Sequence, residues 1–414
     1  MEHDQYKRKT CRYCEEPLGK PFLDLGVQPL ANNLPRHEDA AMPEFHCPLA
    51  VVRCRVCHLV QLTHSVPAGL MFDDYLYVSS TTQTFRSHFA EYARDVRERL
   101  AQKQKPLGVD IGSNDGLLVS CYDKAGMRGI GVEPAKNLAE EANRRGMTTL
   151  NRYFDAEAVR EVLSKYGKAD AVSANNVFAH VDDIQGVCRN VRELLADDGF
   201  FVIEFAYLAT MLEKMFFDMV YHEHVCYIGV TALSFLLRKF GMEIFDIKEV
   251  ATHGGSLRVF IQKKGGPREC RPEVARFLDD EKEKGLLEDK VYSDFAARVL
   301  EFKQKLNRMI HAIKKEGKSI SGYGAPAKAT TIINFCELTP AQIDYIVDDN
   351  PLKQGRLVPG RKIPIVTSEH LGAHPTDYVL IFAWNFAKEI MTKIGFLKEK
   401  NVQFIIPLPE PTTV

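Results

Sequence analysis

Apolar positions in the central part of the chain follow two periods, one typical of helices and one of strands. Residues 84–102 carry apolar side chains at helical spacing, and residues 106–126 then predict a strand, a tight glycine turn and a helix. A second strand is expected at 129–134, a buried strand with a polar loop at 169–183, and a helix end, turn and strand at 194–205. This alternation predicts an α/β domain with a parallel sheet.

The C-terminal part of the chain repeats this pattern after a long helical segment. Residues 272–315 are rich in charge, and their helical apolar spacing predicts a connecting helix or helix pair. Residues 318–335 then predict another strand, glycine turn and helix. We therefore divide the chain into an N-terminal domain at 1–70, a central domain at 71–265 and a C-terminal Rossmann-like domain at 266–414.

The composition of the chain limits the kinds of partner that the protein is expected to bind. The 414 residues carry 54 Lys plus Arg against 55 Asp plus Glu, so no global basic field exists to hold nucleic acid or an anionic membrane. No apolar run approaches the roughly 20 residues that span a bilayer, and the charged N-terminus is unlike a signal peptide. We expect a cytoplasmic protein without nucleic-acid or membrane partners; no pattern indicates its oligomeric state.

Four of the ten cysteines form two closely spaced pairs, in "CRYC" and "CRVC". Each pair has the spacing at which two thiolates hold one tetrahedral ion, which predicts zinc with four sulfur ligands. Such a site has no open position, so the zinc is expected to be structural. The predicted ligands are Cys11, Cys14, Cys54 and Cys57, with Cys47 and His58 as alternatives.

The glycine turn of the central domain, "DIGSNDG", predicts a cofactor site. Glycines let the backbone approach a ligand at the carboxyl end of a strand, and the acid that ends the next strand can hold ribose hydroxyls. The turn resembles the D-x-G-x-G-x-G motif of class I S-adenosylmethionine (SAM)-dependent methyltransferases, except for an asparagine in place of the middle glycine. The same arrangement of glycines and an acid would also suit a binding site for NAD. The predicted cofactor residues here are Asp110, Gly112, Ser113, Asn114, Gly116 and Glu133, with Phe154 and Asp155 near the adenine.

A second glycine turn, "GYGAPA", fits the dinucleotide pattern G-x-G-x-x-A better than the central one does. Gly322, Gly324 and Ala327 supply it, and Asp348 and Asp349 end the next predicted strand. This turn supports an alternative function, that of an NAD-dependent oxidoreductase of a nucleotide sugar. It also suits a nucleotide-sugar site, because a helix N-terminus can hold phosphate.

The segment "MVYHEHVCY", residues 219–227, gathers several groups that can carry a proton or hold a metal. Residues two apart face the same way only on a strand, so His222 and His224 could share a metal only in extended structure. The neighbouring sequence shows no further ligands. We therefore favour proton transfer over a metal site or a polar surface turn.

Several motifs in order resemble the sugar C-methyltransferases of deoxysugar biosynthesis. They include "FLDLGVQPL", "LMFDDYLYVSS", "IGSNDG", "ANNVFAH", "FDMVYHEH", "HGGSLR", "GYGAPAKA" and "FAWN", and they span most of the chain. The resemblance implies a zinc-binding N-terminal domain, a central SAM methyltransferase domain and a C-terminal Rossmann-like domain. It also implies methylation at carbon 3 of a nucleotide-linked 4-keto sugar, carried by dTDP or GDP.

By motif match, His224 is the base that removes the carbon-3 proton, and histidine suits that role near neutral pH. The other catalytic residues implied are Tyr221, Glu223, His180 and Tyr75, while Asn176 is placed near the cofactor. His222 falls on a variable position of the motif.

On the substrate side the resemblance implies His253, Gly254, Arg258, Tyr323 and Lys328, with Lys328 neutralising a diphosphate. A second alternative function is a protein that binds a nucleotide sugar without turning it over.

Overall fold

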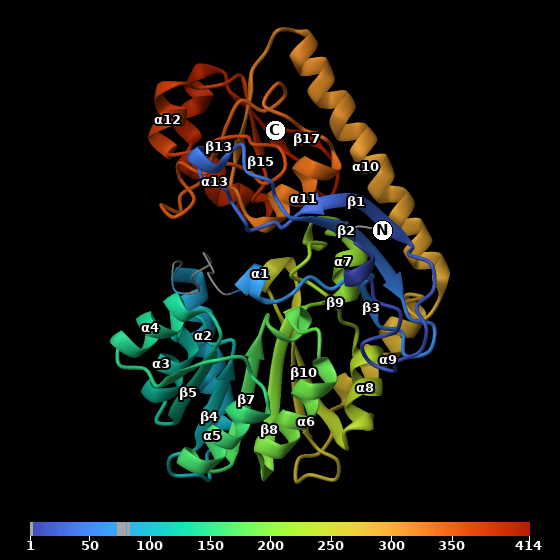
Figure 1. Ribbon diagram of the computed structural model, residues 1–414, viewed down its shortest axis with the longest axis vertical. Helices are drawn as coiled ribbons and strands as arrows, with labels where there is room; N and C mark the ends of the chain where they lie inside the picture. Colours follow the sequence, from blue (N-terminus) through green and yellow to red (C-terminus); the bar gives the residue numbers. More distant parts are fainter. Residues whose placement is uncertain (1–2, 73–79, 81–82) are drawn as a thin grey trace.

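Three β-sheets organise the computed structural model, which describes residues 3–72, 80 and 83–414 (Figure 1). The N-terminal, central and C-terminal parts of the chain each build one sheet, and helices pack on the second and third sheets. This architecture confirms the α/β fold class expected from the alternating pattern. Within the described residues, no helix is long and apolar enough to cross a membrane.

The first sheet has four antiparallel strands in the order β1-β2-β3-β9. Its first three strands come from the start of the chain: β1 (Leu23–Pro29), β2 (His46–Arg53) and β3 (Val60–Leu62). The fourth, β9 (Cys226–Tyr227), comes from the segment 219–227, and it pairs Cys226 with Gln61 and Tyr227 with Val60. The segment that gathers the candidate catalytic groups is therefore tied to the N-terminal sheet.

The central sheet has seven strands in the order β10-β11-β8-β7-β4-β5-β6. The strands from β6 to β8 run parallel, and β11 is antiparallel to both of its neighbours. The strands are β4 (Leu107–Ile111), β5 (Arg128–Glu133), β6 (Thr149–Asn151), β7 (Ala169–Asn175), β8 (Leu195–Ala206), β10 (Met242–Val250) and β11 (Ser256–Lys263).

Helices cover both faces of this sheet, and they bury its apolar strands. Val109, Val172 and Ile203 at the centre of β4, β7 and β8 are fully buried, as expected for parallel strands covered on both sides. The helices are α1 (Gly69–Phe72), α2 (Gln83–Glu98), α3 (Leu117–Lys124), α4 (Lys136–Arg144), α5 (Ala156–Tyr166), α6 (Ile184–Leu194), α7 (Leu208–Glu213) and α8 (Val230–Lys239).

The third sheet has six strands in the order β14-β13-β12-β15-β16-β17, parallel except for β17. Its strands are β12 (Ile320–Tyr323), β13 (Ile346–Val347), β14 (Ile365–Val366), β15 (Tyr378–Ile381), β16 (Gln403–Ile406) and β17 (Thr412–Thr413). Its helices are α11 (Ala327–Phe335), α12 (Ser368–Ala373) and α13 (Ala387–Lys393).

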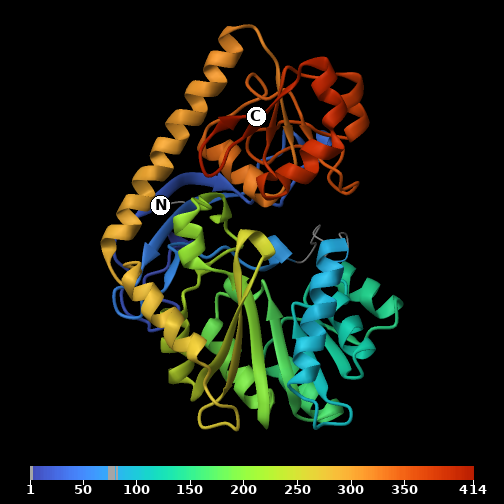
Figure 2. The ribbon, with the colours of Figure 1, turned by 180° about the vertical axis from the view of Figure 1, so that it is seen from behind.

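Two helices connect the second and third sheets, as the charge-rich segment predicts: α9 (Pro272–Glu283) and α10 (Asp289–Lys315). In both ribbon views α10, drawn in orange, runs along one side of the molecule past the N-terminal strands (Figure 2). At 1.5 Å per residue its 27 residues extend about 40 Å, enough to pass from one sheet to the other. Seven buried residues face the core from this helix: Tyr292, Phe295, Val299, Phe302, Leu306, Ile310 and Ile313.

Candidate active site

The two cysteine pairs meet in one cluster. All four Sγ atoms lie within 4.8 Å of one another, with Cys11 to Cys57 at 3.4 Å and Cys14 to Cys54 at 3.5 Å. Four sulfurs around zinc at the usual bond length are about 3.8 Å apart, so this cluster fits a four-sulfur zinc site. The predicted ligand set is therefore the one that the structure brings together.

The two halves of the cluster have the same local geometry. Each pair is followed by a residue with positive φ, Glu15 (67°) and His58 (62°), whose backbone N–H donates to the carbonyl of the first cysteine at 3.0 Å. The alternative ligands are excluded by their positions. The His58 ring is hydrogen-bonded to Arg53 at 2.9 Å, and Cys47 does not belong to the cluster.

The glycine turn after β4 has the conformation that the cofactor motif requires. Gly112, Asn114 and Gly116 all have positive φ, at 63°, 52° and 79°. A Cβ on Gly112 would lie 2.5 Å from a methyl of Val177, so only glycine fits there. Asparagine tolerates the left-handed region better than other side chains do, which explains how Asn114 replaces the middle glycine.

Two buried carboxyl groups flank this turn. Asp110 accepts a hydrogen bond from Ser173 at 2.7 Å, and burial raises its pKa to about 7. Glu133 at the end of β5 accepts from the backbone N–H groups of Asn114 and Ala135, both at 2.8 Å, while burial raises its pKa. Glu133 thus fixes the turn and lies at the strand end where a ribose is expected.

Exchange of Glu133 for alanine is expected to weaken SAM binding by about 10- to 100-fold, because a charged acceptor contributes roughly 1.5–3 kcal/mol through its hydrogen bonds. Isothermal titration calorimetry with SAM would measure the change. Glu140→Ala, an exposed acid on the neighbouring α4, is the control and should bind normally. Tight binding of NADH at this site, without SAM binding, would contradict the assignment.

The structure places the remaining predicted cofactor residues, but their contacts with the cofactor stay predictions. Asp155 caps α5, where its Oδ1 accepts from the N–H groups of Glu157 and Ala158 at 3.0 and 2.8 Å, so its carboxylate has a structural partner. A contact of Phe154 or Asp155 with adenine stays a prediction. Asn176 has positive φ (54°) and donates its N–H to the Glu204 carbonyl at 2.7 Å. Its role at the cofactor also stays a prediction.

The segment 219–227 presents a tyrosine–histidine pair. The Tyr221 hydroxyl lies 2.8 Å from His224 Nε2, and His224 Nδ1 lies 2.8 Å from the Met219 carbonyl oxygen. Because a carbonyl only accepts, Nδ1 carries the proton of the neutral ring, and Nε2 is the basic nitrogen. The His180 ring lies 4.8 Å from the His224 ring and stacks on Phe72. The two predicted histidines are therefore brought together.

Glu223 receives a contact from the N-terminal part of the chain. Asn32 donates from its side-chain amide to Glu223 Oε1 at 2.6 Å. Sequence reasoning missed Asn32, although it lies in the loop that follows the motif "FLDLGVQPL". Tyr75, which was expected beside these groups, lies outside the described residues.

The geometry of His222 argues against a shared metal. Its ring is buried at 2% exposure, and its Nε2 lies 3.0 Å from the Cys47 carbonyl oxygen. His224 instead contacts Met219 and Tyr221. Among the described residues, the four-cysteine cluster is the one group of His, Cys, Asp and Glu with metal-site geometry.

His222 predicts a pH effect on stability. Burial lowers its pKa to about 4 from the ordinary 6.5, against the hydrogen bond to Cys47. The unfolded chain therefore binds the extra proton first, and the native state loses up to about 3 kcal/mol as pH falls from 6.5 to 4. In His222→Gln, whose amide can still donate to Cys47, this part of the loss should be absent. Urea unfolding of both proteins across that range measures the difference, and parallel curves would contradict it.

Two predicted substrate residues, Arg258 and Lys328, contact other residues inside the fold, and their roles in substrate binding stay predictions. Arg258 on β11 faces Glu204 directly across the sheet, and its guanidinium, 3% exposed, bonds that carboxylate at 3.0 Å. Burial alone would raise the pKa of Glu204, but His88 and Arg258 lower it. Lys328, 8% exposed, lies over the Trp384 ring at 4.8 Å and is coupled to the buried Asp218.

The other substrate predictions stay untested by contacts. The Tyr323 hydroxyl donates to Asp349 at 3.1 Å. Gly254 has positive φ (85°) in the loop before β11 and lies against Phe216. The side chain of His253 is outside what the structure describes.

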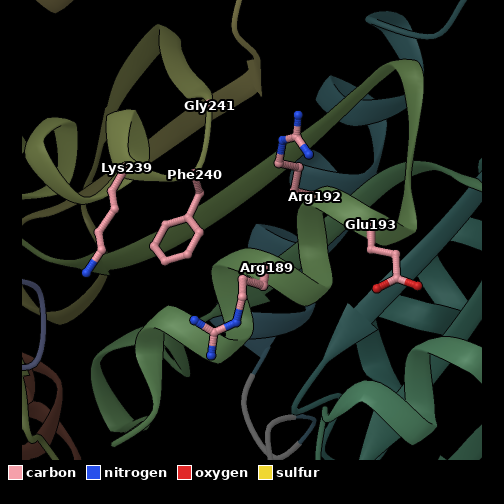
Figure 3. Close-up of a pocket in the computed structure, with 6 residues that line it drawn as sticks. All are labelled: Arg189, Arg192, Glu193, Lys239, Phe240 and Gly241. Carbon is pink, nitrogen blue, oxygen red and sulfur yellow. The ribbon is translucent and has the colours of Figure 1, made fainter.

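A hollow at the opposite end of the central sheet is separate from these groups (Figure 3). It encloses about 620 Å³ where α6 and α8 end, and Arg189, Arg192, Glu193, Lys239, Phe240 and Gly241 line it. None of these residues belongs to the predicted site, which lies at the carboxyl ends of the parallel strands, where ligands of open α/β sheets bind.

Comparison with known proteins agrees with this geometry. Three family models match successive parts of the chain: "Putative zinc binding domain" at 11–72, "Methyltransferase domain" at 85–247 and "C-methyltransferase C-terminal domain" at 251–409. The chain is 36% identical to C-methyltransferase NovU of Streptomyces niveus over 404 residues, which cover 98% of this chain and 96% of that protein. The chain belongs to the C-methyltransferase family.

As a C-methyltransferase of this three-part type, the protein uses SAM as methyl donor and carries a structural zinc site, as its sequence predicts. When bound, SAM supplies an electrophilic methyl group. The Asp110–Gly116 turn and Glu133 are the residues predicted to hold it.

Two solved structures are similar to less than half of this chain. A magnesium protoporphyrin IX methyltransferase from Synechocystis with bound SAM is 15% identical, covering 44% of this chain and 82% of its own, with a TM-score of 0.33. A SAM-dependent methyltransferase from Clostridium acetobutylicum is 11% identical, covering 44% and 92%, with a TM-score of 0.36.

Proposed function

We propose that this C-methyltransferase acts at carbon 3 of a nucleotide-linked 4-keto-deoxysugar. The observation that carries the proposal is the fixed orientation of His224, whose Nδ1 is held by a backbone carbonyl while Nε2 meets the Tyr221 hydroxyl. A carbon next to a carbonyl is acidic enough to be deprotonated by a positioned histidine. C-methylation needs such a carbanion equivalent, so base and reaction class agree.

In the proposed reaction, His224 Nε2 accepts the proton from carbon 3. The Tyr221 hydroxyl leaves Nε2 as the sugar enters and donates instead to the developing enolate oxygen. The enolate carbon then bonds the methyl group, and the electron pair of the broken carbon–sulfur bond stays on sulfur. Glu223, held by Asn32, and His180 orient the sugar ring.

The C-terminal sheet offers a place for the nucleotide. Its turn after β12 is built like the cofactor turn: Asp348 accepts from the N–H groups of Ala325 and Asn350 at 2.7 and 2.8 Å, as Glu133 does in the central sheet. We propose that a dTDP or GDP group binds at this turn, with Tyr323 at its edge. Family membership disfavours the alternative of an NAD-dependent oxidoreductase, which this turn alone would suit.

Turnover of defined substrates tests the proposal. The enzyme is incubated with dTDP- and GDP-linked 4-keto-6-deoxysugars and SAM labelled in its methyl group. Mass spectrometry should show one labelled methyl gained, and NMR should place it on carbon 3. Methylation of oxygen or of another carbon would contradict the proposed reaction, and binding without turnover would favour a non-catalytic sugar-nucleotide protein.

A further inference from the structure

Two residues outside the predicted site, Asp218 and Trp384, meet the predicted substrate residue Lys328 beside the segment 219–227. Asp218 lies in the 3₁₀ helix η5 (Phe217–Met219), Lys328 lies in the first turn of α11, and Trp384 begins η7 (Trp384–Phe386). All three lie in motifs that the sequence singles out, "FDMVYHEH", "GYGAPAKA" and "FAWN", yet the proposed reaction does not use Asp218 or Trp384. The cluster joins the C-terminal sheet to the segment that carries His224.

The Asp218 carboxylate is the centre of the cluster. Its exposure is 0%, and Trp384 Nε1 donates to its Oδ2 at 2.6 Å. Burial raises the pKa of Asp218, while the charge of Lys328 and the backbone N–H groups of Asp218 and Met219 oppose that rise. Its Oδ1 and the Lys328 ammonium have no hydrogen-bond partner among the described residues. Burial of this charged carboxylate between the segment 216–220 and the C-terminal domain costs folding free energy. That cost calls for an explanation.

The cluster is connected to the base through one residue. Met219 follows Asp218 in η5, where the Met219 N–H donates to the Phe216 carbonyl at 3.2 Å and the Val220 N–H donates to the Phe217 carbonyl at 2.9 Å. The Met219 carbonyl oxygen holds His224 Nδ1 at 2.8 Å. Rotation of the peptide between Met219 and Val220 would remove the acceptor that keeps the proton on Nδ1. The conformation of η5, in which Asp218 is the fully buried residue bonded to Trp384, therefore bears on which nitrogen of His224 is basic.

Other contacts hold the same peptide segment to the C-terminal sheet. Thr331 on α11 donates from its hydroxyl to the Val220 carbonyl at 3.0 Å. The Trp384 ring lies 4.5 Å from the Phe216 ring. Residues 216–220 are thus held by α11 and η7 directly before the catalytic groups begin.

We propose that Asp218 is a positioning residue, which Trp384 and Lys328 hold so that the Met219 carbonyl fixes His224 with Nε2 basic. The inference rests on the proposed function for its kinetic consequence, but its structural consequence stands apart. The C-terminal domain then contributes to the base itself as well as to substrate binding.

The test compares Asp218→Asn, Trp384→Phe and the double variant Asp218→Asn/Lys328→Met. Each should lower kcat by about 10- to 100-fold with the Kd for SAM unchanged, because small misplacement of a catalytic group has effects of this size. Trp384→Phe keeps the ring and removes only the N–H donor, so it provides a variant expected to fold. The matched control is Asp246→Asn. Asp246 is a buried aspartate on β10 that pairs with Arg99, and its variant should keep kcat.

A second readout needs no substrate. Nitrogen-15 NMR of histidine-labelled protein, with His224→Asn to assign the signal, should show Nδ1–H in the wild type and a mixed tautomer in Asp218→Asn. The double variant removes both buried charges and should regain thermal stability but not kcat. Recovery of kcat in the double variant, or an unchanged His224 signal in Asp218→Asn, would overturn the inference. Failure of the wild type to methylate a keto sugar would refute the proposed function instead, and the NMR comparison would still decide the role of Asp218.

Discussion

His224→Asn is expected to slow methyl transfer by about 10²–10⁴-fold, the contribution typical of a positioned general base. Asparagine can still donate to the Met219 carbonyl in place of Nδ1, so the segment should keep its conformation while the basic Nε2 is lost. SAM should bind with nearly unchanged affinity, because its predicted residues lie on the turn after β4 and at the end of β5. Single-turnover kinetics measure the loss, and calorimetry measures SAM binding.

Exchange of the carbon-3 proton with deuterated water gives an independent view of the same step. The variant should slow this exchange, since deprotonation precedes methyl transfer. His222→Ala is the control, because His222 contacts the Cys47 carbonyl and should affect stability much more than turnover. If both variants were equally inactive and added metal restored them, a metal site at the two histidines would replace the acid–base interpretation.

The central fold and its cofactor turn were predictable because their signals are local. A left-handed turn between a strand and a helix needs glycine or asparagine, and Gly112, Asn114 and Gly116 meet that need within five residues. The cysteine pairs are local in the same way, since each forms half of the zinc cluster by itself. Only the meeting of the two halves required the sheet.

The environments of the charged residues could not be predicted from the sequence, because the sequence does not show which partner each charged side chain has in the fold. Arg258 and Glu204 are far apart in the chain but directly opposite in the register of β11 and β8, so the sheet neutralises both. The sequence likewise does not show the environment of Lys328. Its burial beside Asp218 and Trp384 results from the packing of the C-terminal domain on η5.

The structure of the segment 219–227 was only partly predictable from its sequence. Its residue types predicted proton chemistry, and the Tyr221–His224 pair agrees with that. What the sequence could not reveal is that its end forms β9 in the N-terminal sheet, since two residues carry too little pattern to mark a strand. Asn32 was missed because its contact with Glu223 joins two domains, and the sequence does not show which residues meet across domains.

Because of this connection, we expect the zinc site to affect turnover although it should hold no substrate. Gln61 on β3 donates to the Cys11 sulfur at 3.1 Å and faces Cys226 in the register with β9. Loss of zinc is expected to loosen β3, and with it β9, the strand that ends the segment 219–227. Structural zinc sites supply much of the folding free energy of small domains, so the effect should be large.

We therefore expect Cys54→Ser/Cys57→Ser to hold less than about a tenth of an equivalent of zinc and to lose at least about tenfold in turnover. Metal analysis gives the zinc content, and hydrogen exchange should show faster exchange across β1, β2, β3 and β9. SAM binding should persist, because the central sheet has its own core. Cys47→Ser is the matched control, a buried cysteine of the same sheet outside the cluster, and it should keep zinc. A zinc content equal to that of the wild type in the double variant would contradict the four-cysteine site. Full turnover without zinc would show that β9 keeps its place unaided, and the proposed link between metal and catalysis would be wrong.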